Sequence, residues 1–280
     1  MSDNEAICLA GLRDTDRDRY LAALLSPADK RAGLVALYGF NAELARIRDV
    51  VREPLPGEVR LQYWRDLVSG VEHGETASNP LGALLLETIR RHDLPVEALL
   101  RMLDARIFDL YDDPIESRGM FEGYAGDTAS ALIQLSSLVL APEEAANCAE
   151  RAGHAGVAQA VAGAILLLPR TRARGQLYIP LEILNAVGLD RDGFLAGEDR
   201  ARMSAAVEAF AGLGREHLAK VRSGGTLPAA VMPAYLPVAL VGCVLDRAVR
   251  KPACVFEDEI RAPQWRRQLL LMWATVRRRV

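Results

Sequence analysis

The chain has 280 residues, of which 50% are apolar and 25% charged, and its formal net charge is −3. This apolar fraction excludes a disordered chain and is sufficient for a folded core. The slightly acidic balance excludes a bulk electrostatic attraction to nucleic acid, so no nucleic-acid partner is expected.

The first residues, the longest apolar run and the cysteines together predict the cellular compartment. Residues 1–5 are polar and acidic, unlike a signal peptide or an arginine-rich transit sequence. The longest apolar run, 229–245, contains Pro233 and Pro237 and is shorter than the roughly 20 residues of a spanning helix. We therefore expect a cytoplasmic protein with at most peripheral contact with the inner membrane. The cysteines show no metal-ligand spacing and are expected to be reduced: Cys8, Cys148, Cys243 and Cys254.

Helical periodicity runs along most of the chain. Apolar residues recurring at i, i+3 and i+4 predict helices over 31–51, 81–91 and 96–110. Asn79-Pro80 and Pro95 are well placed near the starts of the last two. The apolar stretch 124–140 ends at Pro142, where a new helix is predicted.

The stretch 145–168 carries small residues at one helical spacing. Gly156, Ala160 and Gly163 fall at i, i+4 and i+7, which predicts a face nearly bare of side chain. Close approach of another helix explains such a face, and so does a flat ligand. Pro169 is predicted to end this helix.

Four further helical segments are predicted over 181–188, 200–221, 228–249 and 263–279, with a flexible joint at 223–225. No run alternates with period two long enough to predict a sheet. We therefore expect one all-α domain over 1–280, of about ten helices, with a flexible N-terminus over 1–16.

Two acidic motifs do not meet the requirements of metal sites. Residues 14–18 resemble the start of a calcium loop, but Arg19 and Leu25 stand where that loop needs glycine and glutamate. Residues 112–116 resemble an aspartate-rich metal motif, but Pro114 makes a helix there unfavourable. We therefore interpret residues 112–116 as a solvated turn.

Neither the histidines nor the C-terminal arginines show a catalytic pattern. A structural role is expected for all four histidines, with His154 the most open case because it lies on the small-residue helix: His73, His92, His154 and His217. The C-terminal arginines are interpreted as a solvated helix end, with contact to phospholipid head groups as the alternative: Arg266, Arg267, Arg277, Arg278 and Arg279.

A set of short motifs in a fixed order resembles the squalene/phytoene synthase family. The motifs are YLAALLSP (20–27), ALYGF (36–40), LQYWR (61–65), Tyr124 with Ala129 and Ser130, and GQLYIP (175–180). The resemblance implies the all-α isoprenoid-synthase, or terpenoid-synthase, fold with a central cavity. It also implies head-to-head joining of prenyl diphosphates, in which magnesium held by two aspartate-rich motifs neutralises the leaving group.

The positions of those two motifs carry few carboxylates in this chain. By the resemblance, the first motif keeps only its last aspartate, Asp49. Its two leading aspartates are replaced by Ala45 and Arg46, and its upstream arginine is replaced by Ala42. The second motif falls at 166–170, which reads LLLPR. Glu43 lies about 200° around the helix from Ala45 and is not a simple substitute. Losing these groups removes the electrostatic contribution on which such catalysis depends.

The chain is most similar to a branch of the family formed by a respiratory complex I assembly factor. The similarity lies in FNAELA (40–45) with Asp49, RLQYW (60–64), RHDL (91–94), Tyr124 with Thr128, and MPAYL (232–236). It implies a non-catalytic factor, a pseudoenzyme with no cofactor, whose partners are subunits of respiratory NADH dehydrogenase.

The central cavity is expected to hold a prenyl or lipid ligand. Its predicted lining is Tyr38, Asn41, Ala45, Asp49, Gly156, Ala160 and Gly163, with Arg46, Arg48 and Arg170 as candidate anion-binding residues. No metal ligand is predicted. The alternative is an active prenyltransferase of isoprenoid biosynthesis with an atypical magnesium site, and a weaker one is a helical interaction module without a cavity.

Overall fold

The computed structural model describes residues 2–71, 79–257 and 260–280, and all regular secondary structure in these ranges is helical. His73, one of the four histidines considered above, lies outside the described residues. Helices are more numerous than the ten or so expected, because several predicted segments divide into shorter pieces.

The first part of the described chain, up to residue 108, contains six helices. Asn79 caps α5 by accepting hydrogen bonds from the backbone N–H groups of Leu81 and Gly82, both at 3.1 Å. The bounds are α1 (Asp3–Thr15), α2 (Arg17–Leu24), α3 (Ala28–Val50), α4 (Pro54–Val68), α5 (Pro80–His92) and α6 (Val96–Phe108). The helices predicted over 31–51, 81–91 and 96–110 are therefore confirmed as α3, α5 and α6.

The middle of the chain contains a π-helical turn between two α-helices. The apolar stretch predicted over 124–140 is divided by this turn, and the next helix begins at Pro142 as expected. The bounds are α7 (Arg118–Ala125), the π turn η2 (Gly126–Ser130), α8 (Ala131–Leu140), α9 (Pro142–Asn147) and α10 (Ala149–Ala173).

The C-terminal part wraps one side of α10. The predicted stretch 228–249 divides into α14, a 3₁₀ segment and α15, because Pro233 and Pro237 interrupt α-helical hydrogen bonding. The bounds are α11 (Leu181–Ala186), α12 (Arg191–Ala196), α13 (Arg200–Ser223), α14 (Met232–Tyr235), η3 (Leu236–Leu240), α15 (Val241–Arg250), α16 (Cys254–Glu257) and α17 (Gln264–Arg277).

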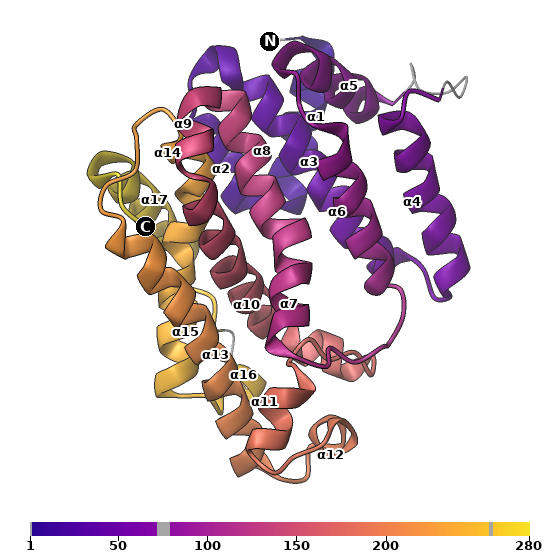
Figure 1. Cartoon of the computed structure of the whole chain (residues 1–280), viewed down its shortest axis with the longest axis vertical. Helices are drawn as coiled ribbons and strands as arrows, with labels where there is room; N and C mark the ends of the chain where they lie inside the picture. Colours follow the sequence, from indigo (N-terminus) through magenta and orange to yellow (C-terminus); the bar gives the residue numbers. More distant parts are fainter. Residues whose placement is uncertain (1, 72–78, 258–259) are drawn as a thin grey trace.

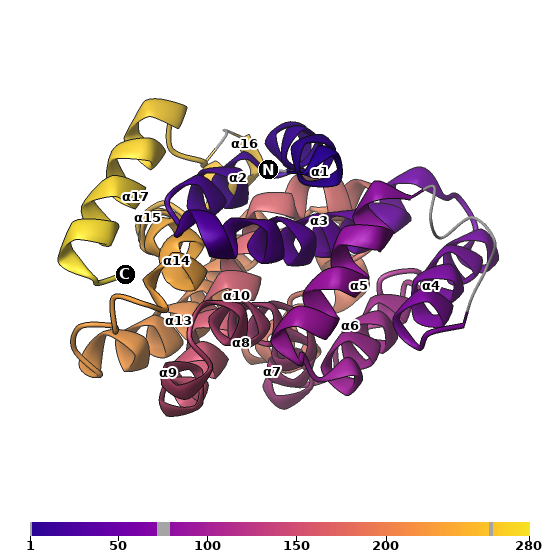
Figure 2. The same cartoon turned by 90° about the horizontal axis from the view of Figure 1, so that it is seen from above.

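Helix α10 lies in the middle of the bundle (Figures 1 and 2), where it packs against α8, η2, α13 and α15. The buried apolar side chains of the described residues form one connected cluster. Tyr38, Phe40, Phe121 and Phe210 are among its largest fully buried members. This core positions α3 and α10 as two walls of the space described below.

Pro169 does not end α10, which corrects the sequence-based prediction. The helix continues to Ala173, although Pro169 lacks the N–H that would bond to the carbonyl of Ile165. The side chains after it are held by tertiary contacts: Arg172 donates to the carbonyls of Phe194 and Leu195 at 3.1 and 2.8 Å. These contacts offset a proline cost of about 3 kcal/mol.

The N-terminus is helical rather than flexible over residues 3–15, which corrects a second prediction. Cys8 and Leu12 of α1 are buried, and the helix packs against α3 and α5. Asp16 then caps α2 by accepting from the N–H of Arg19 at 3.0 Å. The weak hydrophobic periodicity of this segment concealed a helix that is stabilised by packing rather than by its own propensity.

One of the C-terminal arginines is not solvated. Arg267 is buried, and its guanidinium forms an ion pair with Asp18 of α2, with Nε at 3.0 Å from the carboxylate. The other C-terminal arginines, Arg266, Arg277, Arg278 and Arg279, are exposed as expected.

Two helical stretches are long and apolar enough to cross a membrane by length and composition alone. They are Ala149–Ala173 and Met232–Arg250, and 50% and 67% of their most apolar windows are buried inside the bundle. Packing in the core accounts for this apolar composition, since core helices are apolar on most sides.

The small-residue face of α10 divides into a packed part and an open part. A Cβ at Gly156 would overlap the backbone N and Cα of Ser130 in η2, whereas a Cβ at Gly163 would have nothing within 4 Å. Close helix packing therefore explains Gly156, and open space explains Gly163.

This contrast predicts opposite effects of one substitution. Gly156→Ala should lower the free energy of unfolding by about 1–3 kcal/mol because η2 must move. Gly163→Ala should leave it unchanged or raise it by up to about 1 kcal/mol through helix propensity. Urea unfolding of both variants measures this, and equal effects would show that the two glycines have the same surroundings.

Candidate functional site

A cavity of about 890 Å³ lies between α3, α10, the α1–α2 turn and the C-terminal elements η3, α15 and α17. Its presence counts against a helical module with a filled centre. The volume falls within the usual range for a small-molecule site.

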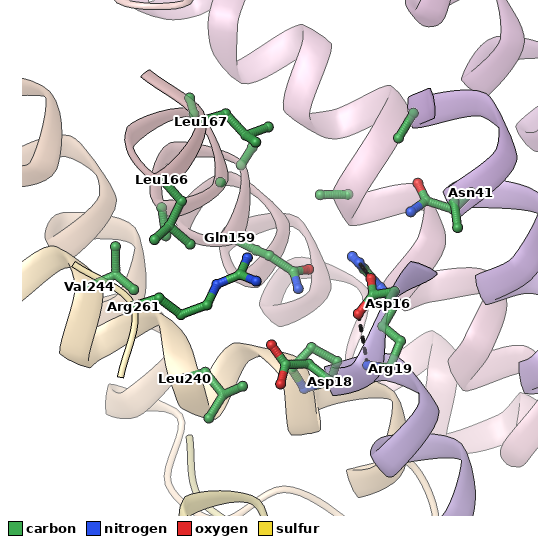
Figure 3. A pocket seen from close by; sticks show the side chains of 18 of the residues that line it. Asp16, Asp18, Arg19, Asn41, Gln159, Leu166, Leu167, Leu240, Val244 and Arg261 are labelled. Atoms are coloured by element: carbon green, nitrogen blue, oxygen red, sulfur yellow. Dashed lines mark hydrogen bonds and ion pairs between the residues drawn. The ribbon is translucent and has the colours of Figure 1, made fainter. Parts of the chain in front are cut away.

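The cavity has an apolar side and a polar side (Figure 3). Leu166 of α10, Leu240 of η3 and Val244 of α15 form the apolar side, while Asp16, Asp18 and Asn41 lie opposite. Gln159 and Arg261 point into the space between them. Such a cavity suits an amphiphile, because the chain and the head group would each meet matching surroundings.

The carboxylate of Asp49 joins the end of α3 to the end of α10. Arg170 donates to one carboxylate oxygen at 2.7 Å, and Arg174 donates to the other at 2.5 Å. Partial burial raises the pKa of Asp49, but the hydrogen bonds and charges of the two guanidinium groups outweigh it and lower the pKa below its ordinary value. Asp49 is thus ionised and neutralised by arginine.

Two further arginines of α3 line the cavity. Arg46 lies 3.6 Å from the carboxylate of Glu43, one turn earlier on the same helix. Arg48 lies 3.6 Å from Asp112 and donates to the carbonyl of Val51 at 3.4 Å. Both pairs are long and partly solvated, so their guanidinium groups can turn toward an anion at small cost.

Arginines outnumber carboxylates in the cavity lining. Ten arginines line it against five aspartates among the described residues. The chain as a whole is acidic, with a net charge of −3. The cavity is therefore a positively charged site in an acidic protein, which favours an anionic head group.

A buried hydrogen-bond network forms the floor of the cavity. Arg106 of α6 donates to Asp109 at 2.8 Å, and the hydroxyls of Tyr124 and Tyr178 donate to the other Asp109 oxygen at 2.9 and 2.7 Å. Arg106 also donates to the side-chain oxygen of Asn41 at 3.4 Å. The network ties α3, α6, α7 and the segment after α10 together.

Burial sets the protonation of this floor. It raises the pKa values of Tyr124 and Tyr178, and the neighbouring Asp109 carboxylate adds to the effect at both. Both phenols therefore remain neutral donors at physiological pH. Nε of Arg106 is buried without a hydrogen-bond partner.

The donors at this cavity do not fit a magnesium cluster. Magnesium facing a diphosphate takes several hard oxygen ligands. Within the described ranges, no three His, Cys, Asp or Glu side chains converge as metal ligands. Asp49, at the end of α3, already has both oxygens occupied by arginine.

The structure brings most of the predicted site residues together. Eight of the ten line the cavity: Asn41, Ala45, Arg46, Arg48, Asp49, Ala160, Gly163 and Arg170. Tyr38 and Gly156 do not. Tyr38 is buried in the core, where desolvation raises the pKa of its hydroxyl to about 12, and Gly156 contacts η2.

Sequence reasoning missed Arg106, Asp109 and Arg174. Arg106 and Asp109 stand three residues apart at the end of α6, and Arg174 follows Arg170 by four residues, a spacing that places both on one helix face. Tyr124 and Tyr178 lay within quoted motifs but received no role. The predicted break at Pro169 hid the Arg170–Arg174 spacing.

His154 lies outside the cavity and contacts His217 of α13. Their Nδ1 atoms are 3.0 Å apart, and Nε2 of His217 is 3.3 Å from Glu122. Glu150 lies 3.9 Å from Nε2 of His154. Burial, followed by the charges of His217 and Lys220, lowers the pKa of His154, although Glu150 and Glu122 act in the opposite direction.

Comparison with known proteins adds the family. The model described as "Squalene/phytoene synthase" matches residues 12–269. The rat protein named "NADH dehydrogenase (ubiquinone) complex I, assembly factor 6" is 29% identical over 92% of this chain and 78% of its own length. The bovine protein of the same name is 30% identical over 84% and 71%. A crystal structure of a dehydrosqualene synthase in complex with a ligand aligns with a TM-score of 0.78 and 16% identity, covering 98% of this chain and 95% of the other.

These comparisons confirm the fold predicted from the sequence. An alignment over nearly the whole length at 16% identity shows the isoprenoid-synthase architecture and no more than that.

Removing the carboxylate at the cavity floor tests the network. Asp109→Ala should lower the free energy of unfolding by about 3 kcal/mol, because it leaves the Arg106 charge buried and unpaired. The control Asp112→Ala removes only a long, partly exposed pair with Arg48, 3.6 Å apart, and should cost less than about 1 kcal/mol. Similar losses in the two variants would mean that the floor network is not what holds these elements together.

The pKa of His154 predicts an acid-sensitive contact. Since this pKa is lowered in the folded protein, its contribution to stability is present above about pH 6.5 and is lost as the pH falls through the folded value. The melting temperature of the wild type should therefore fall more steeply from neutral to mildly acidic pH than that of His154→Gln. Parallel pH profiles would contradict the assignment.

Proposed function

This chain belongs to the squalene/phytoene synthase family, and we propose that it is a non-catalytic member that acts in the assembly of respiratory NADH dehydrogenase. In this proposal its cavity holds an anionic molecule with a prenyl or lipid chain. The proposal places the protein in the cytoplasm, in contact with the subunits of that enzyme.

The observation that carries the proposal is the ion pairing of Asp49 with Arg170 and Arg174. By the resemblance, Asp49 is the one aspartate kept from the first magnesium-binding motif, and Arg170 falls within the segment of the second. Guanidinium groups here supply positive charge directly, and Arg46 and Arg48 add to it. Arginine binds phosphate groups through paired N–H donors and needs no metal for it.

Binding alone does not ionise an allylic diphosphate. Departure of the leaving group requires stabilisation of charge that develops in the transition state. Arg170 and Arg174 are already arranged around an existing charge, the carboxylate of Asp49. This arrangement supports retention of a ligand rather than its turnover.

The relatives support the assembly role. The rat and bovine proteins carry that role in their names and match this chain over most of both lengths. The match to the family model, residues 12–269, contains α3 and α10, so the cavity residues of both helices fall within it.

A diphosphate-release assay separates this proposal from the transferase alternative. Purified protein incubated with farnesyl or geranylgeranyl diphosphate and magnesium should release no more diphosphate than a blank, while native mass spectrometry should retain a bound lipid-like molecule. Turnover above the blank that is lost in Asp49→Asn would establish an active prenyltransferase and overturn the proposal.

Filling the cavity tests whether the assembly role needs it. Gly163→Leu places a side chain in the open space, whereas Gly153→Leu makes the same change on the same helix away from the cavity, also with nothing within 4 Å of its Cβ. In cells deleted for the gene, the wild type and the Gly153 variant should restore assembled NADH dehydrogenase on native gels. The Gly163 variant should not. Equal rescue by both would remove the cavity from the assembly role.

A further inference from the structure

Helix α17 carries an apolar face that none of the described residues covers. Its five exposed apolar side chains recur at helical spacing, and Trp265 and Val276 are 63% and 82% exposed: Trp265, Leu269, Met272, Trp273 and Val276. Large exposed apolar patches mark interaction sites in folded proteins. Figure 2 shows α17 at the edge of the molecule.

The opposite face fixes this helix to the bundle. Arg267, Leu271 and Ala274 are buried, and Arg267 is held by Asp18 of α2. The helix packs against α2 and η3. The exposure is therefore a property of a docked helix rather than of a loose terminus.

The charge around the apolar face has one sign. Residues 264–280 contain five arginines and no Asp, Glu or Lys, in a chain with net charge −3. Arg266, Arg277, Arg278 and Arg279 are exposed. The guanidinium of Arg277 lies 4.6 Å from the centre of the Trp273 ring, so cation and indole share one surface.

We propose that α17 is the surface by which this protein lies on an anionic lipid bilayer. Its 14 residues span only about 21 Å, so the helix would lie in the plane of the interface rather than cross it. The apolar face would enter the acyl boundary, both tryptophans would sit at the head-group level, and the arginines would face anionic head groups.

A lipid surface fits these observations better than a protein. A second copy of α17 would bring its own arginines, and no carboxylate, against the four exposed arginines beside the apolar face. These like charges would repel each other. The same helix also lines the cavity through Gln264, Arg267 and Leu270. The docked orientation therefore places one cavity wall next to the bilayer. The inference stands on α17 and does not require the cavity ligand proposed above.

The tryptophans provide a specific readout in the unmodified protein. The chain has three, and Trp64 is buried in the core against Phe40, with ring centres 5.3 Å apart. A change of emission on adding vesicles therefore reports on Trp265 and Trp273. Vesicles of phosphatidylcholine mixed with phosphatidylglycerol should shift the emission to the blue and sediment the protein, whereas phosphatidylcholine alone should do so far less.

Variants assign the effect to the helix. The double substitution Trp265→Ser with Trp273→Ser should weaken vesicle binding about tenfold or more through lost apolar burial. Arg266→Gln with Arg277→Gln should weaken it severalfold on anionic vesicles, with a smaller salt dependence. The control Leu55→Ser with Val59→Ser, another exposed apolar pair on α4, should bind as the wild type does. Circular dichroism checks that each variant folds.

Three results would overturn the inference. One is a folded wild type that does not bind anionic vesicles, and another is unchanged binding by the double tryptophan variant. The third is a wild-type dimer, seen by light scattering, that does not bind vesicles and that becomes a monomer in the double tryptophan variant. This result would assign the apolar face to contact with a second copy of the chain. The diphosphate-release assay is independent of all three, so this inference and the proposed function can fail separately.

Discussion

The contact between the Asp49 carboxylate and the guanidinium groups of Arg170 and Arg174 sets the chemistry of the cavity. It joins the C-terminal ends of α3 and α10, the two helices that form opposite walls. It also neutralises the carboxylate that would otherwise be available to a cation. The remaining arginines leave the cavity positive, so an anion is the partner that this charge distribution favours.

The rest of the cavity follows from packing. Gly156 lets α10 approach η2, which fixes the helix, and Gly163 leaves open space two turns further along. The buried network of Arg106, Asp109 and the two tyrosines closes the floor with neutral donors and a compensated ion pair. An apolar side, a polar floor and a cationic rim together match a molecule with a long apolar chain and a charged head.

The fold could be predicted from the sequence because helical periodicity and short motifs are read from neighbouring residues. Periodic apolar residues gave α3, α5 and α6, and ordered motifs gave the family. Sequence reasoning failed where tertiary contacts outweigh local preference, as at Pro169, which the contacts of Arg172 hold inside a helix. Tertiary contacts also decide the structure of α1, whose buried face is small. They decide the burial of Arg267 as well, because its partner Asp18 is 249 residues away in the chain.

The candidate site was predictable in part for a similar reason. Residues on α3 were found through the family motifs, and those on α10 through the spacing of its small residues and the position of the second motif. Arg106 and Asp109 were missed because neither lies in a motif, and their importance comes from Tyr124 and Tyr178, which reach them from other segments. The sequence did not reveal the exposed apolar face of α17, because the same helix also carries buried apolar residues, Leu271 and Ala274, and the sequence does not distinguish the two sets.

In the proposed function, arginine holds the anionic ligand without magnesium. Calorimetry with a non-hydrolysable analogue of geranylgeranyl diphosphate, in chelator and in magnesium, tests it most directly. We expect the same affinity in both conditions and a loss of about tenfold or more when Arg170 and Arg174 are both changed to glutamine. Binding that appears only with magnesium, or that is unaffected in the double variant, would contradict it.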